Sequence, residues 1–297
     1  MIRWHWSFRE LPDFAGVGQL QDSPGKLLET ALRAYAKADT GVLRKLYFEP
    51  QGFLSEGQIC ARVMQLGAAY FERLEEIREW SGVEELIMYL TDHACQVLGS
   101  PPGDHDVYVI AGLDTASIYQ SLEYAGLPVT VLCLESVLGD PPKLGVLLSH
   151  ECHHWARRAA LARDVFGDCT GERLVTEGAA VSFSQMLSPG RTIAECCLVP
   201  PETVRWTLDN RSRLERAIGE RLDTTEDMNR LFSRRSRPDL LRGMPARTGY
   251  VLGYTIVQQF IRQTGSTPVD LVSIPWQEVL SDDRWGQTWS MNGDDGR

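Results

Sequence analysis

A pair of histidines four residues apart, His150 and His154, is the feature that most constrains this chain of 297 residues. An apolar run over residues 144–148 precedes them and predicts a helix that begins near Pro141 and continues through both histidines. In a helix, residues i and i+4 lie on the same face, so the two imidazoles can bind one cation. With Glu151, the residues form the pattern H-E-x-x-H, which predicts a metal site on a helix.

Glu151 is the candidate general base of this helix. It lies about 100° around the helix axis from His150, where it can reach a water molecule on the cation without binding the cation itself. A general base needs this position, because it takes a proton from the water and must leave the open coordination site free. The alternative is a helix with histidines exposed at the surface and no metal.

Glu177 is the candidate third ligand. It stands in a small and apolar stretch of a helix predicted for residues 172–187, where a carboxylate is costly to bury without a partner. The chain after His154 is long enough to end one helix, turn, and return antiparallel to it. Since a catalytic zinc uses three protein ligands and keeps one open position, Glu177 is expected to complete the set. The alternative is an ion pair between Glu177 and an arginine such as Arg157 or Arg158.

Three further residues near these helices are weaker candidates. His153 could contact a ligand or line the rim of the site, but a solvated histidine is the favoured interpretation. Asp168 is expected to cap the Glu177 helix, with orientation of a ligand imidazole as the alternative. Cys152 is expected to be a small helix side chain rather than a ligand.

The net negative charge of the chain argues against some classes of binding partner. It carries 40 acidic and 30 basic side chains, a net charge of −10. Neither nucleic acid nor a membrane surface is an expected partner, because general binders of either kind need a positive field. A local cluster of arginines could bind an acidic peptide, a carboxylate terminus or a nucleic acid, although a solvated loop or intramolecular ion pairs are the favoured interpretation. The cluster consists of Arg230, Arg234, Arg235, Arg237, Arg242 and Arg247.

The cysteines and the N-terminal segment bear on the cellular compartment. The seven cysteines are an odd number without C-x-x-C spacing, which is typical of free thiols, so no disulfide is expected. Residues 1–9 lack the apolar core and cleavage site of a signal peptide, and no run of about eighteen apolar residues occurs. The sequence therefore predicts a cytoplasmic protein without a membrane span and leaves its oligomeric state open.

The remaining pattern predicts an α+β chain that is mostly helical, with a small sheet next to the H-E-x-x-H helix. Residues 2–8 alternate between apolar and polar side chains and predict a strand. Short β-branched runs at residues 106–111 and 127–134 predict two more strands. With 43% apolar residues, the chain can bury a sizeable core. Further helices are predicted for residues 23–35, 55–80, 83–98, 201–219, 247–264 and 268–281.

A cluster of helix breakers at residues 100–103 is the predicted internal boundary. It separates an N-terminal strand and helical region, residues 1–100, from a region of residues 101–290 that carries the metal site. The two regions could also form one continuous domain. Residues 291–297 are expected to be a frayed tail.

Three sequence blocks in the C-terminal half carry a resemblance to a known family. The first is H-E-x-x-H-x-x-R, from His150 to Arg157, and the second is Thr-Glu-Gly-Ala-Ala at residues 176–180. The third, Gly-Tyr-Val-Leu-Gly-Tyr at residues 249–254, is similar to a Gly-Tyr-x-x-Gly-Tyr helix near the end of that family. Together they resemble the predicted zinc-dependent protease family with the domain label DUF2268, which is similar to gluzincins.

The resemblance implies a zincin-like metallopeptidase whose zinc is bound by His150, His154 and Glu177, with Glu151 as the general base. Zinc in such a site would polarise the scissile carbonyl of a peptide or protein substrate and lower the pKa of its water to roughly 7. The strand predicted at residues 127–134 precedes the metal helix, as the edge strand of a zincin sheet does. An extended peptide could add to such an edge through main-chain hydrogen bonds.

Tyr250 and Tyr254 are the candidates for a second donor to the developing oxyanion of that reaction. They lie four residues apart on one predicted helix, beside two glycines that allow close approach, and Tyr254 is preferred. The alternative is that both are buried aromatic residues whose hydroxyl groups are satisfied locally.

Two rival functions use the same residues. One is a non-catalytic zinc-binding protein with a partner-binding or regulatory role, and the other is hydrolysis of a non-peptide amide. Glu151 distinguishes the peptidase from the non-catalytic zinc-binding protein, since a structural zinc site gains nothing from a base beside an open coordination position. The mixed His and Glu ligands suit zinc, although they also accept other divalent metals.

Overall fold

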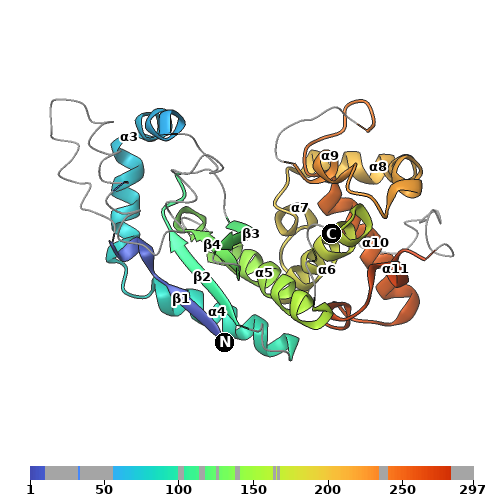
Figure 1. Cartoon of the computed structure of the whole chain (residues 1–297), viewed down its shortest axis with the longest axis horizontal. Helices are drawn as coiled ribbons and strands as arrows, with labels where there is room; N and C mark the ends of the chain where they lie inside the picture. The colour runs from blue at the N-terminus through green and yellow to red at the C-terminus, as the bar shows by residue number, and fades with distance from the viewer. Residues whose placement is uncertain are drawn as a thin grey trace. The chain divides into compact units, whose positions relative to one another are not determined.

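The computed structural model describes most of the chain and divides it into two compact units (Figure 1). Unit 1 consists of Met1–Tyr89 and Gly103–Leu144, and unit 2 of Leu90–Pro102 and Gly145–Arg297. The described residues are 1–10, 33, 56–99, 104–113, 118–124, 127–137, 141–162, 165, 168–233 and 240–281. The helix predicted for residues 23–35, the breaker cluster at 100–103 and the tail after 290 lie outside this description, apart from residue 33.

Unit 1 contains a mixed sheet of four strands. In chain order they are β1 (Ile2–His5), β2 (His105–Ile110), β3 (Ile118–Tyr124) and β4 (Leu127–Cys133). Their order in the sheet is β1-β2-β4-β3; β1, β2 and β4 run parallel, and β3 is antiparallel to β4 (Figure 1). The strands predicted from the sequence at both β-branched runs are therefore present, but β4 is not the edge strand that was expected, because it is paired with β2 on one side and β3 on the other. The α+β class is confirmed, because the rest of the chain is mostly helical.

The N-terminal strand is shorter than its alternating pattern predicts. It ends at His5, and Ser7–Glu10 form the 3-10 helix η1, in which Phe8 is fully buried. The rings of Trp4 and Trp6 stack with centroids 5.1 Å apart. Phe8 is thus an apolar residue of the alternating pattern that is buried in the 3-10 helix and not in the strand. This explains why the pattern predicts a longer strand than the structure contains.

A single carboxylate of β2 holds β1 in register. Asp106 accepts hydrogen bonds from Arg3 at 2.9 and 2.8 Å, and its Oδ1 lies 2.9 Å from Nε2 of His5. The Arg3 guanidinium beside it holds the pKa of Asp106 well below its ordinary value. This ion pair joins two strands that are about a hundred residues apart in the sequence.

Helix α3 (Glu56–Glu79) of unit 1 was predicted as one amphipathic helix and is kinked. Gly67 has φ 67° and ψ −179°, a conformation that only glycine adopts at low cost. Beyond the kink, Tyr70 donates a hydrogen bond to Glu135, in the 3-10 helix η3 (Leu134–Val137) that follows β4. Glu135 also accepts from the Gly112 amide at 2.9 Å, so one carboxylate fixes the helix to the sheet connections.

Unit 2 is built of helices. Helices α4 (Val83–Leu98) and α5 (Pro141–Leu161) end within it, and α4 has the bounds that its apolar pattern predicts. The longer helices that follow are α6 (Thr170–Leu187), α8 (Pro201–Ile218) and α10 (Thr248–Thr264). Short elements connect them: α7 (Ile193–Cys196), η4 (Gly219–Arg221), α9 (Met228–Phe232), η5 (Asp270–Val272) and α11 (Trp276–Val279).

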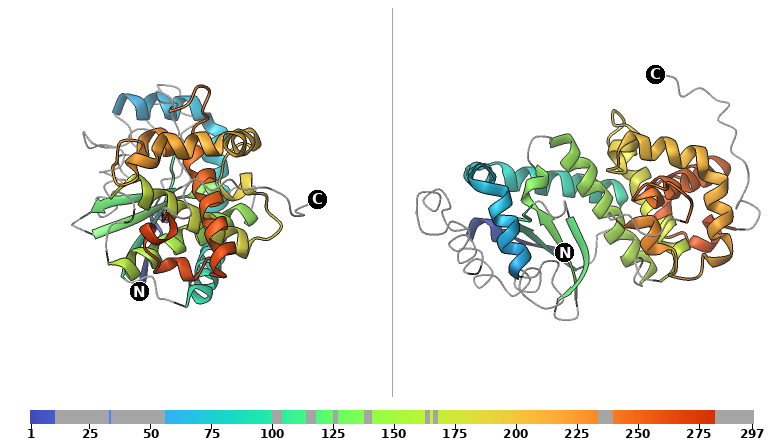
Figure 2. Two further views of the ribbon diagram at one scale, coloured as in Figure 1. Left: turned by 90° about the vertical axis from the view of Figure 1, so that its right-hand side faces the viewer. Right: turned by 90° about the horizontal axis from the view of Figure 1, so that it is seen from above.

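Helices α6 and α10 lie side by side in the centre of unit 2 (Figure 1 and Figure 2). A side chain on Gly178 would overlap the carbonyl group of Gly253, and a side chain on Gly253 would overlap the carbonyl oxygen of Leu174. The two glycines therefore allow backbone contact between the helices. The apolar core of the unit extends from this contact to α8, through Leu214, Val257 and other buried residues.

The prediction of one helix over residues 268–281 is wrong. That segment contains the 3-10 helix η5 and the single turn α11. Pro275 precedes α11, and its fixed φ and missing amide proton interrupt the apolar pattern on which the prediction rests. Among the residues that the structure describes, no helix has the length and apolar character needed to cross a membrane.

Candidate metal centre

Three potential metal ligands converge between α5 and α6. The Nε2 atoms of His150 and His154 are 2.8 Å apart, and Oε2 of Glu177 lies 3.0 Å from the first and 3.3 Å from the second. The side chains of His154 and Glu177 are each 2% exposed, whereas that of His150 is 12% exposed. The cluster is thus buried, with its access to solvent on the side of His150.

This donor set fits a divalent cation such as zinc. A tetrahedral zinc with ligand bonds of about 2.1 Å places its ligand atoms roughly 3.3 Å apart, close to the spacing of these three atoms. Burial, and then the neighbouring His150, lowers the pKa of His154 to about 4, so its imidazole is neutral and able to bind a metal at neutral pH. Two neutral imidazoles and one carboxylate are a common set of protein ligands for zinc.

Glu151 lies in the same site without joining the cluster. Its side chain is buried, and Oε2 has no hydrogen-bond partner among the described residues. Burial, and then the negative charge of Glu177, raises the pKa of Glu151 well above its ordinary value. A carboxylate with a raised pKa is a stronger base, and an unpartnered oxygen is available to a water molecule or a substrate.

Arg173 is a residue of the site that the sequence analysis did not identify. It lies one turn before Glu177 on α6, and its Nη2 is 2.7 Å from Oε1 of that carboxylate. It also interacts electrostatically with Tyr250. Although burial opposes it, Arg173, followed by His154, lowers the pKa of Glu177 well below its ordinary value. The i, i+4 spacing of Arg173 and Glu177 was the available signal.

The two candidate tyrosines of α10 lie in different surroundings. The ring of Tyr250 is 6.5 Å from that of His150, which places Tyr250 beside the cluster. Tyr254 donates a hydrogen bond of 2.5 Å to the side chain of Gln185 and packs in an apolar group with Val146 and Val181. The structure therefore places Tyr250 beside the site. The hydroxyl group of Tyr254 has a local hydrogen-bond partner, as expected for a buried aromatic residue without a role in catalysis.

The structure corrects the favoured interpretations of two weaker candidates. His153 is fully buried rather than solvated, and its Nε2 lies 3.1 Å from the carbonyl oxygen of Pro268. Asp168 is exposed and is not the N-cap of α6; Cys169 is, and its sulfur accepts from the Glu172 amide. Cys152 is fully buried, as a small helix side chain can be.

Arg157 and Glu172 form a separate, fully buried ion pair near the site, with Nη2 2.7 Å from Oε1. Arg157 also donates to Thr176 and to the carbonyl groups of Leu271 and Ile274. The ion pair of Glu177 with an arginine, the alternative considered from the sequence, is therefore present, but its arginine is Arg173 and not Arg157.

The arginine cluster predicted from the sequence is only partly described. Arg230 forms ion pairs with Asp227 at 2.9 Å and Glu226 at 3.6 Å, and Arg242 is exposed. Arg247 donates to the Leu198 carbonyl and stacks on the ring of Tyr250, 4.4 Å from its centroid. Residues 234–239, with the three remaining arginines, lie outside the described residues. Arg230 therefore forms intramolecular ion pairs and Arg242 is exposed, as the favoured interpretation of this charge run expects.

The cysteines whose side chains the structure describes are free thiols: Cys95, Cys133, Cys152, Cys169, Cys196 and Cys197. Apart from Cys95 they are buried. None of them belongs to the group of residues that could hold a metal ion.

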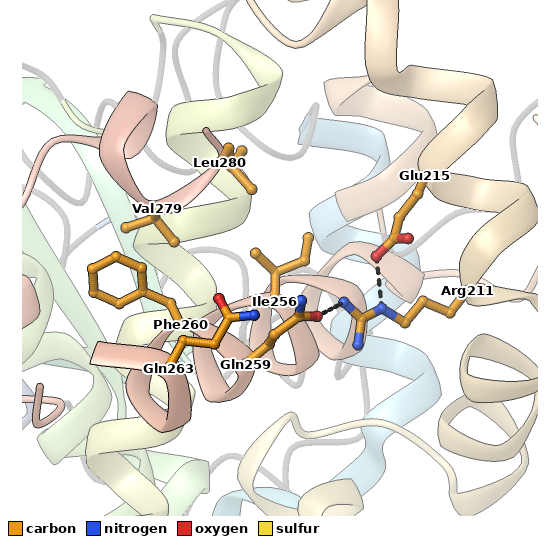
Figure 3. Close-up of a pocket in the computed structure, with 8 residues that line it drawn as sticks. All are labelled: Arg211, Glu215, Ile256, Gln259, Phe260, Gln263, Val279 and Leu280. Atoms are coloured by element: carbon orange, nitrogen blue, oxygen red, sulfur yellow. Dashed lines mark hydrogen bonds and ion pairs between the residues drawn. The ribbon is translucent and has the colours of Figure 1, made fainter. Parts of the chain in front are cut away.

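A small pocket lies elsewhere in unit 2, between α8, α10 and α11 (Figure 3). Arg211 extends into it, held by Glu215 at 2.6 Å and by Gln259 at 2.6 Å. Apolar side chains that include Ile256 and Phe260 form the rest of its wall. The pocket has room for about one water molecule and is separate from the histidine cluster.

The geometry defines the class of this site: two histidines and one glutamate that could hold a metal ion. Residues 115–281, more than half of the chain, match the family described as "Predicted Zn-dependent protease (DUF2268)". The chain belongs to this family. No curated protein and no solved structure matches the chain.

Proposed function

We propose that the chain is a zinc-dependent peptidase of the gluzincin type, with a zincin-like catalytic region. The observation that carries this proposal is the convergence of His150, His154 and Glu177 within 4.8 Å, with Glu151 buried beside them. Membership of a family described as zinc-dependent proteases supports it.

The three clustered side chains would hold the ion and leave one coordination position open. Zinc in this place would polarise a peptide carbonyl and activate a water molecule. Glu151 would take the proton of that water at its unpartnered Oε2 and pass it to the leaving amine. The raised pKa of Glu151 suits this transfer, because the protonated carboxyl group must exist long enough to give the proton away.

Tyr250 is the proposed donor to the oxyanion, in preference to Tyr254. Its ring lies beside His150, and the guanidinium of Arg247, stacked 4.4 Å from the ring centroid, holds the ring in place. A hydroxyl held in place before the reaction stabilises developing charge better than one that must reorient. Tyr254, in contrast, already donates its proton to Gln185.

Hydrolysis of a peptide library by the wild type and by E151Q tests the proposal. Glutamine keeps the size of Glu151 but cannot take the proton, so turnover should fall by about 10²–10⁴-fold while bound zinc is retained. E202Q, which removes the same charge from an exposed position of α8, is the control and should behave as the wild type. A wild type that binds zinc and hydrolyses no peptide would contradict the proposal in favour of a non-catalytic zinc-binding protein.

A further inference from the structure

Arg173 contacts both a proposed zinc ligand and the proposed oxyanion donor. Its guanidinium pairs with Glu177 at 2.7 Å and interacts electrostatically with Tyr250. It also lies over the ring of Phe232, 5.5 Å from the centroid. The side chain is 22% exposed, which leaves it little freedom to adopt another position.

The two oxygens of Glu177 face different partners. Oε2 is directed toward the histidines, at 3.0 Å from His150 and 3.3 Å from His154. Oε1 is directed toward Arg173. The contact of Arg173 through Nη2 holds Oε1 on the side of the carboxylate away from the histidines, so Oε2 stays directed toward them.

This arrangement bears on how many oxygens of Glu177 would bind a metal ion. A carboxylate can bind a cation through one oxygen or through both, and binding through both would use a further coordination position. With Oε1 held toward Arg173, the cation would be bound by Oε2, the oxygen that faces the histidines. The open position that a substrate or a water molecule needs is thereby preserved.

We propose that Arg173 is a positioning residue of the metal centre: it restricts Glu177 to one metal-binding oxygen and holds the Tyr250 hydroxyl beside the site. The inference rests on the proposed function, because it assumes that His150, His154 and Glu177 bind the ion. Arg173 would not touch the metal. It would act through the two side chains that it orients.

Visible absorption of the cobalt-loaded full chain tests this proposal without an activity assay. Four-coordinate Co²⁺ absorbs more strongly in the visible range than five-coordinate Co²⁺, so the spectrum reports the number of ligands. In R173Q, Oε1 of Glu177 loses its ionic partner and is free to join Oε2 on the metal. We expect the visible bands of R173Q to shift and to lose intensity relative to the wild type.

Two further variants separate positioning from a general loss of structure. R173K should keep the wild-type spectrum, because an ammonium group one turn before Glu177 can still reach Oε1. R211Q is the matched control, since Arg211 forms the same kind of buried i, i+4 pair with Glu215, at 2.6 Å, away from the cluster (Figure 3). Its cobalt spectrum should equal that of the wild type.

An R173Q spectrum identical to the wild type would overturn the proposal. If R173Q does not fold, X-ray absorption of the zinc-loaded wild type gives the answer, because it distinguishes a carboxylate bound through one oxygen from one bound through two. Two bound oxygens of Glu177 would also overturn it. A wild type that takes up neither ion is a different failure, which would overturn the proposed function itself.

Discussion

The guanidinium of Arg157 lies 2.7 Å from Oε1 of Glu172, and both side chains are fully buried. This pair joins α5, which carries the two histidines, to α6, which carries Glu177. Arg157 also donates to the carbonyl groups of Leu271 and Ile274, near the C-terminal end of the described chain. The two helices of the site are therefore fixed to each other by a network that does not include the candidate ligands.

Replacing Arg157 with alanine should destabilise the protein by about 3–5 kcal/mol, because it leaves the Glu172 carboxylate buried without its ionic partner. The free energy of unfolding from urea denaturation measures the effect. R158A, at the next and partly exposed position, is the control and should cost less than about 1 kcal/mol. Equal losses for the two variants would contradict the structural role assigned to Arg157.

The contact between α6 and α10 predicts a difference between two glycine substitutions. G178A should destabilise the protein by about 1–3 kcal/mol, because its methyl group would overlap the Gly253 carbonyl and force the helices apart. G145A, in α5, should be neutral or stabilising by up to about 1 kcal/mol, since its methyl group meets only Leu90 at 3.8 Å. The melting temperatures of the two variants measure the difference. If G178A were as stable as G145A, the close contact between α6 and α10 at Gly178 would be contradicted.

Loss of the Tyr250 hydroxyl should slow hydrolysis more than loss of the Tyr254 hydroxyl. Y250F removes the proposed donor to the oxyanion, so kcat should fall by about 10²-fold with little change in KM. Y254F removes only the hydrogen bond to Gln185 and should keep most of the activity. Steady-state kinetics on one peptide substrate compares them, and the opposite order would restore Tyr254 as the donor.

The ion pair of Asp106 with Arg3 predicts that the stability of the fold decreases at acidic pH. The pKa of Asp106 is lowered in the folded state, so the pair stabilises the fold above the unfolded-state pKa of about 3.9. Its contribution is lost as the pH falls through the lower, folded-state pKa. Because Arg3 is partly exposed, solvent screens the pair and its contribution at pH 5 is small. The difference in melting temperature between wild type and D106N should therefore shrink from pH 5 to pH 2; a constant difference would contradict it.

The elements with strong local signals could be predicted from the sequence. Helix α4 has its predicted bounds because its apolar periodicity and its flanking residues agree. Strand β3, Ile118–Tyr124, was missed. Its register shifts between Tyr119 and Leu122, which breaks the two-residue alternation that identifies a strand.

The candidate site could be predicted only as far as spacing defines it. His150 and His154 share a helix face by their separation alone, and the structure brings Glu177 to them. Spacing does not say which turn of α10 lies level with His150, so the sequence could not show that the ring of Tyr250 is the one beside that histidine. Arg173 was missed because an arginine four residues from a glutamate is usually an exposed helix pair; burial of Glu177 is what makes this one different.

The metal content of the purified chain tests the central claim most directly. Elemental mass spectrometry on the wild type, H154A and E151Q counts zinc per chain. We predict about one zinc per chain in the wild type and in E151Q, and its loss in H154A, because only His154 of the two altered residues belongs to the ligand set. A wild type without bound metal, or an H154A variant that retains a full equivalent of zinc, would contradict the metal centre on which the proposed peptidase depends.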